Sequence, residues 1–259
     1  MAFQRALWTG TLSKYTAPAW PCPSCRKGTL KLQKDSLLSH ETASSKLERN
    51  EKYWDVQLVE SVFSCWLKCS IATCKQDVVV SGYGRIEEYY GQGDEDSNPT
   101  TIYGEYYVPR FMVPMSDMFD IPAKCPKEIA QQLRASFSLF WHDKSAAAGR
   151  VRVALEVLMD HLNIKRRRKQ SNGKIAKLTL HQRIDIFPAD DSAIGTHLMA
   201  LKWLGNAGSH ESGITQDDLL DAFEILDHIL IEIFEQRSKK VMALAKQLTS
   251  KHGRRARKR

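Results

Sequence analysis

Long apolar runs are absent from this 259-residue sequence, because charged or polar residues interrupt every hydrophobic stretch before it reaches the roughly 20 residues that a membrane-spanning helix needs. The N-terminal segment MAFQRALWTGTLSKYTAPAW also lacks the apolar core and small-residue cleavage site of a secretory signal. No Walker loop, dinucleotide fingerprint or serine triad is present, so nucleotide hydrolysis, redox chemistry and acyl transfer have no support. We therefore expect a soluble cytoplasmic protein with no membrane partner.

Positive charge is concentrated in two short runs. The formal net charge is +8, and the runs are KRRRK at residues 165–169 and KHGRRARKR at the C-terminus. Such clusters attract phosphate backbones through counterion release, without sequence preference. We therefore predict contact with RNA or DNA, with a solvated loop and a frayed tail as the alternative. The candidate nucleic-acid-binding residues are Lys165, Arg166, Arg167, Arg168, Lys169, Arg254 and Arg255.

The first 121 residues are of mainly β character. Three stretches, GTLKLQ, WDVQLVESVFSCWLKC and DVVVSGYGRIEEYY, carry the β-branched and aromatic residues that favour strands. The polar segment 35–51 between the first two is compatible with a loop or a short helix. Residues 91–126 contain an acidic, Gly-rich turn followed by a proline-punctuated run, which predicts an extended linker and a domain boundary near residue 122.

Beyond this boundary, apolar residues recur at a spacing of about 3.6 residues, which is typical of amphipathic helices. Pro126 suits the first position of a helix, and Asp143 can cap a second helix. The run Thr215 to Asp218 resembles a capping box that opens the final helix. The five predicted helices span residues 127–141, 143–163, 177–187, about 190–207, and 215 to beyond 236.

Four of the six cysteines have the spacing of two metal-binding knuckles. Cys22 and Cys25 frame Pro-Ser before one predicted strand, and Cys69 and Cys74 precede another. Four thiolates form a closed tetrahedral site, so we predict structural Zn²⁺, with unliganded core cysteines as the alternative. Catalytic zinc is not expected, because no histidine lies near either pair. Cys65 is an alternative ligand, but on a strand it lies too far along the chain from Cys69 to share one ion.

The segment LMALKWLGNAGSH places an amine, an amide and an imidazole at steps of four residues. Lys202, Asn206 and His210 would line one face of a continuing helix. Lysine can neutralise a phosphate, asparagine can orient it, and histidine can act as general base on a hydroxyl. These three are the candidate catalytic residues. In the alternative reading, Gly205 and Gly208 let the chain leave the helix and Asn206 caps it.

Together these motifs carry a resemblance to a known family. The CPSC knuckle, the second cysteine pair, the helix GRVRVALEVLMDHL and the segment LKWLGNAGSH resemble a bacterial domain family of uncharacterised function. The helical half of that family is similar to the HEPN superfamily (higher eukaryotes and prokaryotes nucleotide-binding), and the resemblance covers roughly residues 20–237.

The sequence patterns predict an α+β protein in which a small β-rich zinc ribbon precedes an all-α helical bundle, and the resemblance implies that this bundle is HEPN-like. The expected division is residues 1–121, the bundle at residues 122–250, and a basic tail at residues 251–259. The family further implies a homodimer that works with partner proteins in restriction, toxin or antiviral defence systems.

Many HEPN proteins are metal-independent ribonucleases, whose motif combines an arginine, a polar residue and a histidine. Asn206 and His210 match the polar residue and the histidine, but Gly205 occupies the place of the arginine. The bidentate phosphate contact of a guanidinium is therefore missing, and Lys202 offers only a point charge one turn away.

Three functions follow as hypotheses. The first is a non-catalytic module that binds nucleic acid or a partner protein in a defence or restriction complex. The second is a ribonuclease in which His210 takes a proton from a ribose 2'-hydroxyl. The third is a scaffold or antitoxin-like protein whose final helix packs against a partner through the stripe Leu219, Phe223, Leu226, Leu230 and Phe234.

Overall fold

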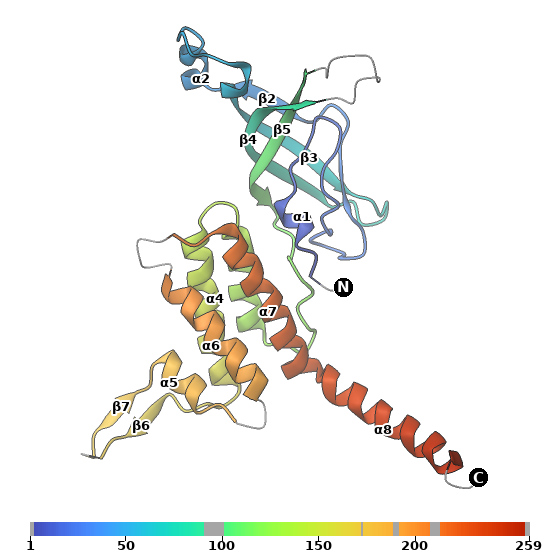
Figure 1. Ribbon diagram of the computed structural model, residues 1–259, viewed down its shortest axis with the longest axis vertical. Helices are drawn as coiled ribbons and strands as arrows, with labels where there is room; N and C mark the ends of the chain where they lie inside the picture. The colour runs from blue at the N-terminus through green and yellow to red at the C-terminus, as the bar shows by residue number, and fades with distance from the viewer. Residues whose placement is uncertain (1–2, 91–100, 172, 189–191, 208–212, 257–259) are drawn as a thin grey trace. The chain divides into compact units, whose positions relative to one another are not determined.

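The computed structural model describes residues 3–90, 101–171, 173–188, 192–207 and 213–256. It is a mixed α+β protein, with a curled antiparallel sheet in its N-terminal part and helices in its C-terminal part (Figure 1). The chain divides into two compact units. One contains Gln4–Met118 and Phe137–Asp143, and the other contains Met1–Phe3, Phe119–Ser136 and Lys144–Arg259.

The sheet of the first unit has the strand order β1-β3-β4-β5, β2 also pairs with β3, and every pairing is antiparallel. The three stretches predicted as strands contain β1, β3 and β4. The segment left open as a loop or a helix contains β2 and the short helix α2. The elements are α1 (Ala6–Thr9), β1 (Leu30–Leu32), β2 (Leu38–Glu41), α2 (Ala43–Glu48), the 3-10 helix η1 (Val56–Leu58), β3 (Glu60–Cys69), β4 (Asp77–Tyr90) and β5 (Thr101–Val113).

Alternation along β3 builds one face of the core. Phe63, Cys65 and Leu67 are buried, whereas the residues between them are exposed. Successive side chains of a strand point to opposite faces, so these three share the inner face. Cys65 lies opposite the buried Val80 of β4, and Leu67 lies opposite the buried Val78.

The expected linker is wrong for residues 101–113, which form β5 against β4. Pro109 lies in this strand at a register shift, opposite Gly82. A Cβ at Gly82 would lie 2.0 Å from the carbonyl oxygen of Val108, so only glycine allows this close approach of the two strands. A proline is tolerated here because a bulge already interrupts the ladder of hydrogen bonds.

The second unit consists of helices and one two-stranded hairpin. Its first two helices match the predicted ones closely, and α6 matches the helix predicted over about residues 190–207. Of the described helices, none is long and apolar enough to span a membrane. The elements are α3 (Lys127–Leu139), α4 (Lys144–His161), β6 (Arg167–Lys169), β7 (Ile175–Lys177), α5 (Leu180–Asp185), α6 (Ser192–Ala207), α7 (Gln216–Glu235) and α8 (Arg237–Ala256). The last three residues of α3 belong to the first unit.

The capping box at Thr215 is confirmed. The Thr215 hydroxyl accepts a hydrogen bond from the Asp218 N–H (3.1 Å), and the Thr215 N–H donates to the Asp218 carboxylate (2.8 Å). From there α7 buries Leu219, Phe223, Leu226 and Leu230. This part of the stripe considered as a partner surface therefore lies in the core.

Two helix predictions are wrong in detail. The helix predicted over residues 177–187 is shorter at both ends, because residues 175–177 form β7 and α5 spans only Leu180–Asp185. The final helix does not continue through Gln236, which has a φ of 51° and separates α7 from α8. The Ser238 hydroxyl donates to the Glu232 carboxylate (2.9 Å) across this break. The expected basic tail is largely the end of α8, which extends to Ala256.

Candidate functional site

The first cysteine pair is held by a tight turn. The Cys22 N–H donates to the Gly28 carbonyl (2.8 Å), and the Arg26 N–H donates back to the Cys22 carbonyl (3.0 Å). Arg26, immediately after Cys25, has a φ of 56°. This left-handed conformation reverses the chain, so that both cysteine side chains lie on the inside of the turn.

The second pair repeats this arrangement at the end of β3. The Cys69 N–H donates to the Gln76 carbonyl (2.9 Å), and the Cys74 N–H donates to the Ile71 carbonyl (3.0 Å). Lys75, immediately after Cys74, has a φ of 55°, as Arg26 has in the first turn. Pairing of β1 with β3 sets Leu30 opposite Cys69 and so brings the two turns together.

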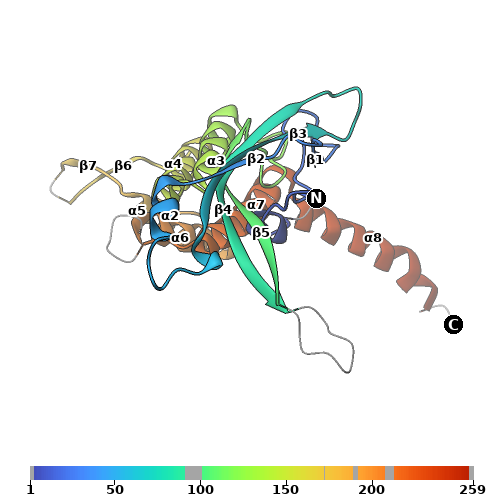
Figure 2. The same ribbon diagram turned by 90° about the horizontal axis from the view of Figure 1, so that it is seen from above.

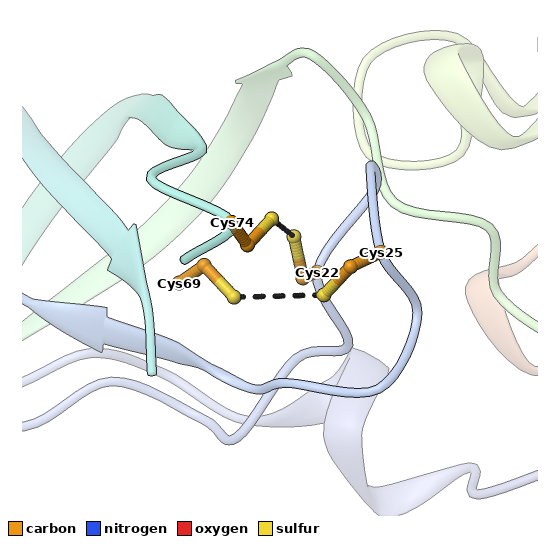
Figure 3. A group of neighbouring side chains, drawn as sticks. All are labelled: Cys22, Cys25, Cys69 and Cys74. Atoms are coloured by element: carbon orange, nitrogen blue, oxygen red, sulfur yellow. Dashed lines mark hydrogen bonds between the residues drawn. The ribbon is translucent and has the colours of Figure 1, made fainter. Parts of the chain in front are cut away.

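Four sulfur atoms face one another in this cluster (Figure 3). The Sγ atoms of Cys22 and Cys74 are 3.7 Å apart, as are those of Cys25 and Cys69, and all four lie within 4.8 Å of one another. These distances exclude disulfides, whose sulfurs are about 2.05 Å apart. Zn–S bonds of about 2.3 Å place the sulfurs of a tetrahedral site about 3.8 Å apart. The cluster is therefore compatible with a metal site.

Backbone groups surround the cluster closely. The N–H of Gly28 points at the sulfur of Cys25, and the N–H of Ile71 points at the sulfur of Cys69, each at 3.4 Å. A Cβ at Gly28 would lie 2.6 Å from the Cys69 sulfur, which is closer than real contacts allow. The sequence reading missed this glycine, although its place three residues after Cys25 could have identified it.

The thiols of the cluster differ in acidity. Hydrogen bonds from the backbone of Gly28 and Lys27 lower the pKa of Cys25 to about 6, whereas burial raises the pKa of Cys69 to about 12. Cys25 therefore ionises more readily than Cys69 when no cation is bound. A divalent cation at this cluster would supply the charge that lets the remaining thiols ionise, and its binding would then be coupled to folding.

The other two cysteines lie outside this cluster. Burial raises the pKa of Cys65 and that of Cys125 to about 11, so both thiols stay protonated at neutral pH. Cys65 thus remains a core residue of β3, as its position on a strand predicts.

The basic run forms a β-hairpin rather than a loop. Residues 167–169 (β6) pair antiparallel with residues 175–177 (β7), and Gly173, with a φ of 80°, lies in the turn. Figure 2 shows the hairpin projecting beyond the helices of its unit. Lys174 and Lys177, which the linear run did not include, lie on the same hairpin. The segment 165–177 therefore contains seven lysines and arginines and no acidic residue.

The base of the hairpin is anchored by one carboxylate. Asp160 accepts two hydrogen bonds from Arg166 (2.7 and 2.5 Å) and one from Arg183 (2.6 Å), and the Arg183 side chain is only 6% exposed. Hydrogen bonds from Arg166, and then from Arg183, lower the pKa of Asp160. Arg166 is therefore committed to an ion pair, whereas all three residues of β6 are exposed.

The candidate catalytic residues are only partly described. Lys202 and Asn206 both lie on α6, at the predicted spacing of four, and His210 lies outside the described residues. Lys202 is 8% exposed, and its Nζ lies 3.4 Å from the centre of the Trp203 ring. Its ammonium group is thus in contact with an aromatic ring. Arg254 and Arg255 lie near the end of α8.

Comparison with known proteins divides the chain into two matched regions. Residues 10–112 match a domain of unknown function, DUF8608, and residues 134–251 match another, DUF4145. No curated protein and no solved structure is significantly similar to the chain.

Proposed function

We propose that this protein is a non-catalytic nucleic-acid-binding module, in which the β6–β7 hairpin contacts the phosphate backbone of RNA or DNA. The single observation that supports this proposal is the charge of the hairpin, which has seven cationic side chains and no carboxylate over residues 165–177. The HEPN resemblance suggests the setting, a complex of a bacterial defence or restriction system.

The shape of the hairpin supports the same proposal. A two-stranded ribbon fits the major groove of a duplex, and its cationic side chains can follow a single strand equally well. Cations that neutralise phosphates release counterions, which makes binding tight at low salt and independent of sequence. The ion pairs of Asp160 with Arg166 and Arg183 fix the base of the ribbon, so that its strands keep their direction.

For the cysteine cluster we propose structural Zn²⁺ in a zinc-ribbon-like site. The four-thiolate donor set leaves no open position for a substrate, and soft thiolates favour zinc over magnesium or calcium. Cys22, Cys25, Cys69 and Cys74 would hold the ion and so fix the two turns that flank β1 and β3.

Binding of fluorescein-labelled single-stranded RNA and duplex DNA, measured by anisotropy at about 50 mM salt, tests the hairpin. The variant Arg167→Gln/Lys169→Gln removes two exposed cations, and Lys124→Gln/Lys127→Gln removes two exposed cations elsewhere in the same unit. We expect the hairpin variant to bind at least about 10-fold more weakly than the control, since it loses the counterion release of two phosphate contacts, which is large at low salt. Equal affinities of the two variants would contradict the proposal.

A further inference from the structure

An apolar stripe on α8 is left exposed. Val241, Met242, Leu244 and Leu248 are between 59% and 61% exposed. The spacing of Val241, Leu244 and Leu248 places these three on one face of the helix. In Figure 1, α8 runs on beyond α7, and its far end lies away from the other helices of the unit. A soluble protein rarely leaves such a stripe uncovered unless a partner covers it.

The charge of α8 limits what that partner can be. The helix contains seven lysines and arginines and no acidic residue. Lys240 is four residues before Leu244 and Lys251 is three residues after Leu248, so both amines border the stripe. Two α8 helices packed stripe to stripe would bring these like charges together. The surface that receives α8 should therefore be apolar with acidic edges.

A groove between α6 and α7 has this composition. Apolar residues of α6 and α7 line its first part together with Asp218 and Asp221. A second hollow adjoins the first at Ile225, which lines both, and is bordered by Glu224 and by His197 and His228, whose rings are 5.2 Å apart; we treat the two together as the α6–α7 groove. The apolar residues of the first part are Ala200, Leu201, Leu204, Ala222 and Ile225.

The lengths of the two surfaces agree. The groove follows α7 from Asp218 to His228, which is about 15 Å at 1.5 Å per residue. The stripe from Val241 to Leu248 is about 10 Å long by the same measure. The stripe can therefore lie wholly within the groove, with Lys240 or Lys251 near the acidic side chains.

The helix cannot reach the groove of its own chain without unwinding. Only Gln236 separates α7 from α8. Two antiparallel helices need a connection of about two to five residues. A fold-back of α8 along α7 is therefore excluded while both helices keep their ends, so an α8 helix that binds in the groove has to come from another molecule.

We propose that α8 of one copy of this chain occupies the α6–α7 groove of a second copy, and that the second copy returns the same contact. Such a reciprocal, two-fold arrangement makes the same contact two times, once with each α8. The two contacts together help the interface to reach the roughly 1,200 Å² that stable interfaces bury. Lys239 and Lys246, on the opposite face of α8, stay outside the interface. The inference does not depend on the proposed nucleic-acid binding.

Sedimentation of the full-length protein, without nucleic acid and over a wide concentration range, tests this proposal. We expect a dimer for the wild type and for the control Lys239→Ser/Lys246→Ser. The variant Leu244→Ser/Leu248→Ser should weaken the dimer at least about 100-fold, because it removes apolar burial in both contacts. Circular dichroism checks that each variant is folded. A monomeric wild type, or a stripe variant as dimeric as the control, would overturn the proposal.

A groove variant identifies the surface that receives α8. Ala200 is exposed, so Ala200→Arg adds bulk and positive charge to the groove without disturbing the core, and it should also give a monomer. Mixing this variant with the stripe variant restores one intact contact in each mixed pair. We expect mixed dimers to form at a higher concentration than the wild type requires. If Ala200→Arg stays dimeric, or if the mixture forms no mixed dimer, α8 does not bind in this groove.

Discussion

Replacing Gly28 with alanine should weaken metal binding although Gly28 is not a ligand. The added Cβ would lie 2.6 Å from the Cys69 sulfur, 3.0 Å from Ile71 Cγ1 and 3.1 Å from Ser70 Oγ. The φ of Gly28 is not positive, so the backbone tolerates alanine and the effect is steric. Pairing of β1 with β3 holds the Cys69 backbone, and the sulfur has to move instead.

The size of the effect follows from the tolerance of a tetrahedral site. Ligand distances in metal sites vary by only about 0.2 Å, whereas the sulfur must withdraw by several tenths of an ångström. Substitutions next to the ligands usually reduce metal affinity about 10- to 100-fold. We therefore expect a loss of this size, equal to about 1.4–2.8 kcal/mol of binding free energy.

Competition against a chromophoric zinc chelator measures this loss. Gly149→Ala is the matched control, because a Cβ at Gly149 meets nothing within 4 Å and alanine favours the helix α4. Zinc affinity of the control should equal that of the wild type. Equal affinities for Gly28→Ala and Gly149→Ala would refute the reasoning that this glycine shapes the cluster.

Two further predictions concern the second unit. Asp160→Asn should lower the free energy of unfolding by about 2 kcal/mol, because it leaves the nearly buried Arg183 with a weaker partner. Since the folded state lowers the pKa of Asp160, this contribution is present above about pH 4 and is lost as the pH falls through the lowered value. Urea unfolding of both proteins at pH 7 and pH 3 checks this: the difference in the free energy of unfolding should be smaller at pH 3, and a difference as large at pH 3 as at pH 7 would contradict it. Separately, we expect no cleavage of single-stranded RNA in EDTA, because Lys202 packs on Trp203 and Gly205 replaces the motif arginine. Cleavage by the wild type that His210→Ala abolishes would establish a ribonuclease instead.

Local patterns in the sequence predicted the elements whose signals are local. The β-branched and aromatic residues of β3 and the capping box at Thr215 are each contained within a few consecutive residues, and both the strand and the cap appear as expected. The cysteine spacing predicted two turns, but their meeting depends on the pairing of β1 with β3, a long-range contact. The two turns were expected to meet only because four thiolates together complete a tetrahedral metal site.

Features that depend on distant residues were not predictable. Pro109 predicted a linker, although it lies in β5. The bulge that tolerates this proline involves Gly82 on β4, and nothing near Pro109 in the sequence indicates it. The run RRK at β6 shows no alternation and no β-branched residue, so nothing local marks it as a strand. Its base is held by Asp160 and Arg183, which lie 23 residues apart. The break at Gln236 lies between two segments of continuous helical periodicity, and glutamine is not a usual left-handed residue.

Salt dependence of nucleic-acid binding tests the central proposal most directly. The measurement is the slope of log K against log salt concentration for duplex DNA, with wild type and Arg167→Gln/Lys169→Gln compared by anisotropy. If both side chains neutralise phosphates, the variant should lose about 1.8 from the magnitude of the slope, since each contact contributes about 0.9. An unchanged slope would show that these side chains touch no phosphate, and the proposed role of the hairpin would be wrong.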